Sequence, residues 1–361
     1  MALIERLQRQ IHQAGPLSVA HFMTLCLLDP VDGYYPTKDP IGAGADFITA
    51  PEVSQMFGEL IGIWLIHVWE QLGKPQRLNL VEFGPGKGTM MSDVLRTARS
   101  VPAFSSALNV HLIEASAALV AVQAQTLGPF EQPMNWCDHL RETADGPLVV
   151  LANEYLDCLP VRQFVRQKDT WFERLVDCTP AGELQYVLAN APLSPLDIEQ
   201  IPAGLRAAEP DSLIELRPGM DELFAALKDR AKADPVIGLL IDYGPASSEC
   251  GDTLQAVFCH KKVDPLLRPG QVDLTARVDF ASVSELAKTH GFTVTGPLEQ
   301  GKWLQQMGIM QRAAALMSNG QAKKSVIARQ VHRLTDADEM GNLFKVLAIS
   351  SDKTHKLAGF G

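Results

Sequence analysis

The sequence predicts an α/β protein with a doubly wound, mostly parallel sheet, an N-terminal helical part and an inserted cap region. Short apolar runs of strand length alternate with helical patterns from about residue 77 onwards. The first of these runs leads directly into a glycine-rich turn, which is typical of a ligand-binding α/β unit. The chain has 361 residues, of which 46% are apolar and 20% charged, so it can bury a sizeable core.

The N-terminal region, residues 1–76, is expected to be helical and to pack on the core and cover it. Apolar residues recur at helical spacing within residues 3–28, and again along residues 53–72. Thr49 and Glu52 have the spacing of a capping box at the start of this second helix. They also follow a glycine-containing loop that would allow a lid to move, so we consider them as substrate or lid residues.

Residues 77–154 are expected to form the first half of a cofactor-binding domain. Strands that are apolar throughout are typical of parallel sheets, because helices cover both faces of such a sheet. The pattern predicts strands at residues 78–83, 107–114 and 147–152, and helices at residues 89–99 and 117–127.

The next region, residues 155–234, has a different pattern and is expected to form the inserted cap. Short alternating runs joined by turns predict antiparallel strands between residues 161 and 188. A proline-rich, acidic stretch at residues 190–213 follows, and a helix over residues 220–231 ends the insertion.

Residues 235–361 are expected to return to the sheet as the second half of the cofactor-binding domain. A buried strand at residues 235–242 opens this part. Helical patterns and one short strand follow, and the last apolar run, residues 343–350, could lie antiparallel in the sheet. The helices are predicted at residues 282–289, 303–317 and 324–333, and the short strand at residues 292–295.

Composition narrows the choice of partners and location. A formal net charge of −10 repels phosphate backbones, so we expect no nucleic acid partner. The most apolar stretch covers residues 60–69, whereas a membrane span needs ~20 residues, so we expect no membrane segment. The six cysteines lack C-x-x-C spacing, which predicts reduced thiols and no metal site. Because the start of the chain also has no apolar signal region, we expect a cytoplasmic protein.

The strongest local signal is the segment Glu82-Phe-Gly84-Pro85-Gly86-Lys-Gly88, between a predicted strand and a predicted helix. Alternating glycines allow positive φ angles and a close approach of a ligand, and the helix N-terminus offers unpaired N–H groups. The segment is no P-loop, because glycine instead of serine or threonine follows its lysine. A dinucleotide fingerprint fits Gly84 and Gly86 but lacks its third glycine.

The carboxylate of Glu82 distinguishes between a ligand that contains a pyrophosphate and a ligand that carries cations. An anion beside a pyrophosphate is repulsive, whereas an anion beside an ammonium or a sulfonium is favourable. S-adenosylmethionine carries both of these cations and no phosphate. We therefore assign Glu82 and the loop residues Gly84, Pro85, Gly86 and Gly88 to the binding of S-adenosylmethionine.

Further polar residues follow the next predicted strands. Glu114 is placed to bind the ribose hydroxyls, Asp138 to accept from the adenine amino group, and Asn153 to line the cofactor at the next strand end. In open α/β sheets, ligands bind beyond the carboxyl ends of the strands, so these side chains are expected to meet the glycine loop in one crevice. Each acid taken alone could instead cap a helix.

Six stretches spread over nearly the whole chain carry a resemblance to a known family: residues 46–59, 81–89, 153–164, 241–244, 251–254 and 273–279. In these stretches the chain resembles the MidA-like methyltransferases, the bacterial and mitochondrial relatives of a complex I assembly factor that methylates protein arginine. Arg277 stands where that family usually has histidine. The resemblance implies a class I methyltransferase sheet, S-adenosyl-L-methionine as cofactor, and a protein substrate, for which a subunit of respiratory complex I is a candidate.

Transfer of a methyl group to a guanidinium needs carboxylates that orient the cation. We expect Glu154, Asp157 and Asp242 to be the catalytic carboxylates, and Tyr243 and His260 to line the acceptor pocket. Asp273, near Thr275, could form a polar wall of this pocket together with His260. Two alternatives stay open: methylation of a small molecule under the cap, and a non-catalytic module that binds an adenosyl ligand. The oligomeric state is not readable from the sequence.

Overall fold

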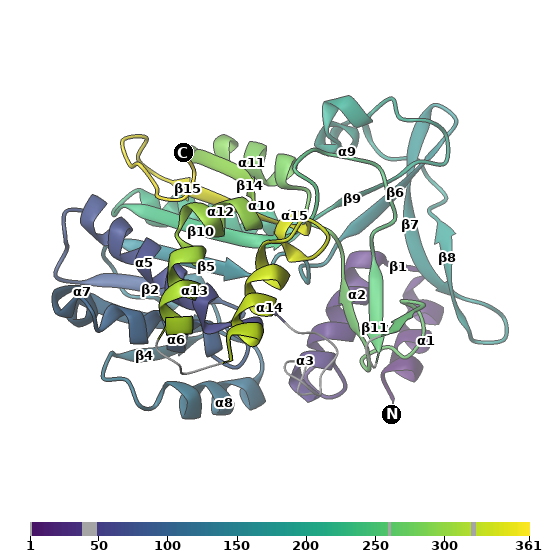
Figure 1. Cartoon of the computed structure of the whole chain (residues 1–361). Coiled ribbons are helices and arrows are strands. Elements are labelled where there is room, and N and C mark those ends of the chain that lie inside the picture. Colours follow the sequence, from purple (N-terminus) through teal and green to yellow (C-terminus); the bar gives the residue numbers. More distant parts are fainter. Residues whose placement is uncertain (1, 38–48, 259–260, 319–322) are drawn as a thin grey trace.

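The computed structural model describes residues 2–37, 49–258, 261–318 and 323–361. Its centre is a seven-stranded sheet with helices on both faces (Figure 1). Across the sheet the strands follow the order β14 (Thr293–Glu299), β15 (Phe344–Ser350), β10 (Val236–Tyr243), β5 (Leu148–Asn153), β2 (Leu78–Phe83), β3 (Leu108–Ile113) and β4 (Met134–Cys137).

The sheet is mostly parallel, which confirms the predicted fold class. Strands β10, β5, β2, β3 and β4 pair in parallel. β15 pairs antiparallel with both β10 and β14, as the sequence had suggested for the last apolar run. Consequently, β2 and β5 end at the same edge of the sheet, where the glycine loop and Asn153 lie.

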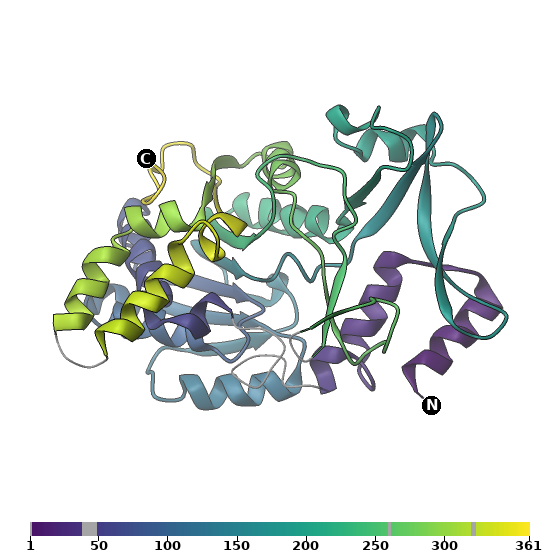
Figure 2. The same cartoon turned by 45° about the vertical axis from the view of Figure 1, so that its right-hand side comes forward.

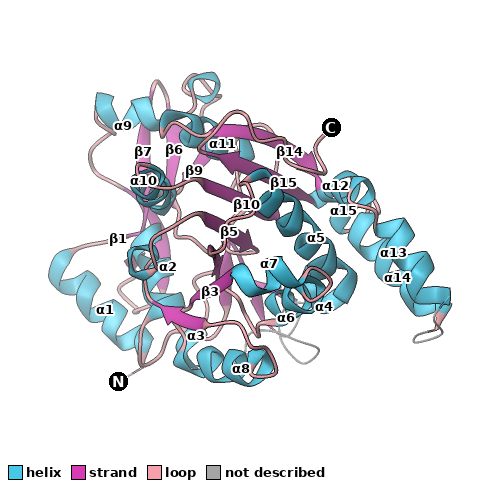
Figure 3. Cartoon of the chain, turned by 90° about the vertical axis from the view of Figure 1, so that its left-hand side faces the viewer, coloured by secondary structure: helices cyan, strands magenta, loops and turns pink. Residues whose placement is uncertain are grey.

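The central strands β5 and β10 are apolar until their carboxyl ends because successive residues face opposite layers, both of which are buried. In β10, Leu239 belongs to one hydrophobic cluster and the next residue, Leu240, to the other. The first cluster packs under helices that include α5 (Gln55–Gln71), α6 (Thr89–Ala98), α12 (Gln300–Gln306), α13 (Ile309–Ser318) and α14 (Lys324–Thr335). The second packs under α10 (Pro218–Ala231) and α11 (Phe280–Thr289), as Figure 3 shows.

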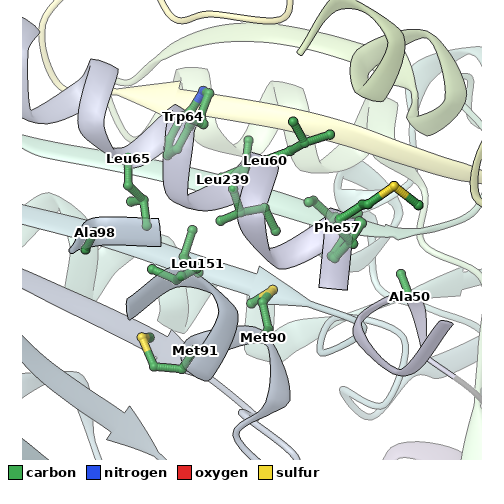
Figure 4. Close-up of a cluster of buried hydrophobic side chains, with 14 of the residues drawn as sticks. Ala50, Phe57, Leu60, Trp64, Leu65, Met90, Met91, Ala98, Leu151 and Leu239 are labelled. Atoms are coloured by element: carbon green, nitrogen blue, oxygen red, sulfur yellow. The ribbon is translucent and has the colours of Figure 1, made fainter. Parts of the chain in front are cut away.

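Figure 4 shows the first cluster, in which Leu60 and Trp64 of α5 lie over Leu151 and Leu239 of the sheet. This packing explains the broad apolar face that the sequence shows along residues 53–72.

The helix predicted from Thr49 onwards is broken in two. α4 (Ala50–Val53) ends at Ser54, whose φ of −163° is extended, and the Ser54 side chain caps α5 by accepting from Met56 N–H. Thr49 makes no side-chain cap, so the predicted capping box is wrong. Glu52 instead accepts a hydrogen bond of 2.5 Å from the Thr89 hydroxyl, which ties α4 to the start of α6.

The N-terminal helices pack against a second sheet, which lies on the right in Figure 1. Figure 2 shows the N-terminal helices beside the strands of this second sheet from another side. The helix predicted over residues 3–28 is interrupted, because Gly15 (φ 91°) ends the first helix and Pro16 follows it. The elements are α1 (Leu3–Ala14), β1 (Leu17–Ser18), α2 (Val19–Leu28) and α3 (Tyr34–Thr37).

The predicted cap strands form this second sheet, which is antiparallel. It consists of β6 (Arg162–Gln167), β7 (Thr170–Cys178), β8 (Leu184–Leu188) and β9 (Leu213–Leu216), together with β1. A third sheet, which no sequence pattern indicated, consists of three short strands: β12 (Lys261–Val263), β11 (Gln255–Phe258) and β13 (Asp273–Thr275). In the described residues no helix is long and apolar enough to cross a membrane.

The remaining elements connect these layers. They are α7 (Pro102–Ala107), α8 (Ala117–Leu127), the 3-10 turns Leu140–Glu142 and Ala203–Leu205, α9 (Pro195–Gln200) and α15 (Met340–Leu343).

Candidate functional site

The carboxyl ends of the parallel strands open into a cavity of about 270 Å³. Parallel strands end at one edge, so residues that follow different strands meet there although they are far apart in the sequence. The predicted site residues among its walls are Thr49, Gly84, Gly86, Glu114, Asp138, Glu154 and Asp157. A smaller cavity of about 60 Å³ adjoins the glycine loop and is lined by Glu52, Glu82, Pro85 and Asn153, among others.

The glycine loop has the backbone that its sequence predicted. Gly84, Gly86 and Gly88 have φ angles of 60°, 55° and 77°, which a residue with a side chain rarely adopts. A Cβ atom on Gly84 would come within 3.0 Å of the Tyr155 ring. Gly88 is the N-cap residue of α6 and does not line the large cavity, so its role is to turn the chain into the helix.

Glu114 is held in place by a side chain that the sequence analysis missed. One Glu114 carboxylate oxygen accepts from Ser116 N–H at 2.8 Å and the other from Gln123 Nε2 at 3.0 Å. Gln123 also donates to the Gly86 carbonyl at 2.7 Å and is fully buried. Gln123 therefore joins the glycine loop to Glu114, and no local motif marks this glutamine within its helix.

Two buried oxygens beside the smaller cavity lack a donor. Neither Glu82 Oε2 nor Asn153 Oδ1 finds a hydrogen-bond partner in the part of the chain that the structure describes. Burial, and secondarily the charge of Glu114, raises the pKa of Glu82 to about 8. A ligand that brings an ammonium group would supply the missing donors and favour the ionised Glu82.

Glu154 follows β5 in a strained conformation, with a φ of 52° for a residue that has a side chain. Its Oε1 accepts from Ala50 N–H at 2.8 Å, at the start of α4, and from Asn153 Nδ2 at 3.3 Å. Burial raises its pKa to about 7, and the nearby Asp242 adds to the increase. Glu154 is thus aimed into the cavity by contacts from two elements.

Of the two predicted catalytic aspartates, Asp157 lines the large cavity and Asp242 does not. Asp157 is 8% exposed and lines the large cavity. Asp242 is fully buried and is absent from the cavity wall. Its carboxylate accepts from the backbone N–H groups of Leu156, Asp157 and Tyr243 at 2.8, 3.1 and 2.8 Å. Asp242 was predicted to be a catalytic carboxylate. Its burial and these three hydrogen bonds indicate instead that Asp242 positions the turn at residues 154–157.

The remaining predicted residues are spread around the site. Asp138 is exposed at the wall of the large cavity. Tyr243 lies behind the wall and donates from its hydroxyl to Thr275 Oγ1 at 2.7 Å. Arg277 pairs with Glu249 at 2.8 Å, away from the cavity. His260 lies outside the described residues.

Tyr35 and Tyr155 also line the cavity, although no sequence pattern indicated either residue. Asp273 and Thr275, which were expected near His260 in a polar acceptor wall, line the same cavity. Tyr155 packs on Phe83, with ring centroids 5.2 Å apart. In the ranges that the structure covers, no group of three His, Cys, Asp or Glu side chains is placed to hold a metal ion.

These observations fit a ligand with cations, hydroxyls and no phosphate. The glycine loop runs beside the cavity in left-handed conformations, two buried oxygens lack donors in the described residues, and the surrounding ionisable side chains are mainly carboxylates. Together with the seven-stranded sheet, they define an S-adenosyl-L-methionine-dependent methyltransferase. A family model described as "Putative S-adenosyl-L-methionine-dependent methyltransferase" matches residues 60–298, and the chain belongs to this family.

Individual relatives agree with this assignment. The chain is 35% identical to the protein arginine methyltransferase NDUFAF7 homolog, mitochondrial, of Drosophila melanogaster, over 96% of this chain and 84% of that protein. It is 32% identical to the Homo sapiens protein arginine methyltransferase NDUFAF7, mitochondrial, over 96% of this chain and 83% of that protein.

Among solved structures, a COG1565 superfamily member from Burkholderia thailandensis bound to S-adenosyl-homocysteine is similar over the whole molecule. The two are 26% identical with a TM-score of 0.84, over 99% of this chain and 93% of that chain. S-adenosyl-L-methionine is therefore the cofactor of this enzyme.

The comparisons correct the expectation of a cytoplasmic protein. The relatives from Drosophila melanogaster, Danio rerio, Mus musculus and Homo sapiens are all named as mitochondrial. Reduced cysteines indicate a reducing environment but do not distinguish one reducing compartment from another, and the lack of an apolar signal region does not distinguish between such compartments either.

Proposed function

We propose that this enzyme transfers a methyl group to an arginine side chain of a protein. The observation that carries this proposal is that two carboxylates, Glu154 and Asp157, face the same cavity as the glycine loop and Glu114. A guanidinium is a planar cation with several N–H donors, and carboxylates are its preferred partners. The names of the relatives from Drosophila melanogaster and Homo sapiens support arginine as the acceptor.

We assign the cofactor to the glycine loop and its neighbouring acids. Gly84, Gly86 and Pro85 would contact it through the backbone, and Gly88 would shape the turn. Glu114 would bind the ribose hydroxyls and Asp138 the adenine amino group. The two side chains with unsatisfied buried oxygens, Glu82 and Asn153, would accept from the ammonium of its amino-acid part. Thr49 and Glu52 line the smaller cavity and would close it.

The carboxylates have a chemical task because a guanidinium is protonated at neutral pH. When bound, the cofactor supplies an electrophilic methyl group on sulfur. The acceptor nitrogen forms the new bond to carbon while the carbon–sulfur bond breaks and leaves its electron pair on sulfur. One proton must then leave the nitrogen. Glu154 can take this proton, because burial has raised its pKa to about 7.

The test is a transfer assay with S-adenosylmethionine that carries a labelled methyl group. The purified enzyme is incubated with protein extract from cells that lack its gene, and the protein is hydrolysed to identify labelled amino acids. We expect labelled methylarginine. We also expect Glu154→Gln to lower the transfer at least ~100-fold, because it removes the proton acceptor, and to leave cofactor affinity nearly unchanged.

The matched control is Glu183→Gln, at an exposed position in the cap, which should behave as the wild type. Label in methyllysine, or only in the small-molecule fraction, would reject protein arginine as the acceptor. Full transfer by Glu154→Gln would reject the assigned role of Glu154.

A further inference from the structure

One wall of the large cavity comes from parts of the chain outside the cofactor-binding sheet. Asp273 and Thr275 belong to β13, and Tyr35 belongs to α3. Because alternate residues of a strand face opposite sides, Asp273 and Thr275 line the cavity whereas Leu274 lies in the hydrophobic cluster with α2. The alternation therefore presents a carboxyl and a hydroxyl to the cavity.

Asp273 is fixed by Tyr35. The Tyr35 hydroxyl donates to Asp273 Oδ1 at 3.1 Å, and Asp273 is only 7% exposed. Burial, together with the charge of Asp273, raises the pKa of Tyr35 well above its usual value, so the phenol keeps its proton and remains a donor. Since α2, next to α3, shares a hydrophobic cluster with β13, the N-terminal segment and the strand hold this pair together.

The carboxylate of Asp157 faces the same space. It is 8% exposed, and across the described residues no group donates a hydrogen bond to its carboxylate and no cation pairs with it. The guanidinium of Arg217, whose charge acts on Asp157, donates to the backbone carbonyls of Ala276 and Arg277. A carboxylate that is buried in this way is costly unless a ligand supplies the donor.

We infer that Asp157 and Asp273 together bind the cationic head of the methyl acceptor, and that Tyr35 is a positioning residue that orients Asp273. The inference rests on the proposed function, because it takes the acceptor to be a cation. It adds the side chains that would select for charge, and these come from α3, β13 and the turn after β5. A guanidinium presents N–H donors along two edges, so it can contact two carboxylates at once.

The test measures acceptor binding apart from catalysis. Protein saturated with S-adenosylhomocysteine is titrated with N-acetyl-arginine methylamide or with its uncharged analogue N-acetyl-citrulline methylamide, and binding is followed by ligand-observed NMR. We expect the arginine probe to bind at least roughly tenfold more tightly than the citrulline probe. Asp273→Asn should weaken arginine binding roughly tenfold, and Tyr35→Phe about threefold, with unchanged affinity for S-adenosylhomocysteine in both.

Asp169→Asn, at an exposed turn in the cap, controls for the loss of one negative charge and should change nothing. Equal binding of the two probes, no binding of the arginine probe to the wild type, or wild-type binding by both Asp273→Asn and Tyr35→Phe would each overturn the inference. Tyr35→Phe removes a single oxygen and keeps the test valid if Asp273→Asn does not fold. If N-acetyl-lysine methylamide binds better, with the same dependence on Asp273, the cation site stands and arginine as the acceptor fails.

Discussion

At the scale of the residue, the site is defined by buried polar atoms whose partners are incomplete. Glu82 and Asn153 each keep a buried oxygen without a donor in the described chain, and Asp157 is nearly buried without a cation. Glu114 differs, because Ser116 and Gln123 already hold both of its oxygens. The first three therefore identify where a ligand must supply donors, whereas Glu114 is prepared in a fixed orientation.

We predict that Glu114→Ala weakens S-adenosylmethionine binding by ~1–3 kcal/mol, because the hydrogen bonds to the ribose would be lost while the fold is kept. Calorimetric titration measures this change. Glu131→Ala, at an exposed position before β4, is the matched control and should bind as the wild type. An unchanged affinity in Glu114→Ala would remove the ribose role from Glu114.

At the scale of the element, the end of one strand fixes the turn after its neighbour. β10 is parallel to β5, and Asp242 at its carboxyl end accepts from Leu156 and Asp157 N–H in the turn that follows β5. The turn carries Glu154 in a left-handed conformation, which the start of α4 supports through Ala50 N–H. Asp157 is thus positioned by β10, which does not line either cavity, and Glu154 by α4, which lines the smaller one.

We predict that Asp242→Asn destabilises the protein by on the order of 3 kcal/mol, because an amide group cannot accept from all three buried N–H groups. It should also lower methyl transfer more than cofactor affinity, since the turn rather than the glycine loop is disturbed. Denaturant unfolding and calorimetry measure the two effects. A variant with wild-type stability would contradict the positioning role of Asp242.

At the scale of the molecule, acids from several layers converge on two adjoining cavities. Glu82 of β2 lines the smaller cavity, whereas Glu154, which follows β5, and Asp273 of the three-stranded sheet line the large one. Burial and mutual repulsion raise the pKa of Glu82 to about 8, that of Glu154 to about 7, and that of Asp157 well above its usual range. Without a cationic ligand the enzyme therefore loses stability wherever these carboxyls ionise.

This arrangement predicts the pH dependence of stability. The pKa of Glu82 rises from 4.5 to about 8 on folding, so its contribution is complete below pH 4.5 and is lost as pH rises through about 8. Between about pH 6 and about pH 8, the free energy of unfolding of the ligand-free enzyme should fall by ~2 kcal/mol through this group alone. Denaturant unfolding at the two pH values should show a smaller fall for Glu82→Gln. If the free energy of unfolding fell equally in the wild type and in Glu82→Gln, the raised pKa of Glu82 would be contradicted.

The sequence by itself determined the parallel core, the glycine loop and the candidates Glu82, Glu114, Asn153 and Glu154. These are local features: a strand buried on both faces is apolar throughout, and a residue that ends such a strand must lie at the binding edge. The final apolar run follows the parallel series as a late, single strand, and this position made it a candidate for the antiparallel pairing that the structure confirms.

Only the tertiary structure decided which side chains from distant segments meet at the cavity and in which direction each of them points. Tyr35 and Asp273 are separated by 238 positions and come together because α2 and β13 share one hydrophobic cluster. Asp242 looked like a catalytic acid in the sequence, yet the hydrogen bonds of its buried carboxylate turn it toward the backbone. Local patterns determine which residues end a strand, whereas the direction and the partner of each side chain depend on packing between distant segments, which no local pattern records.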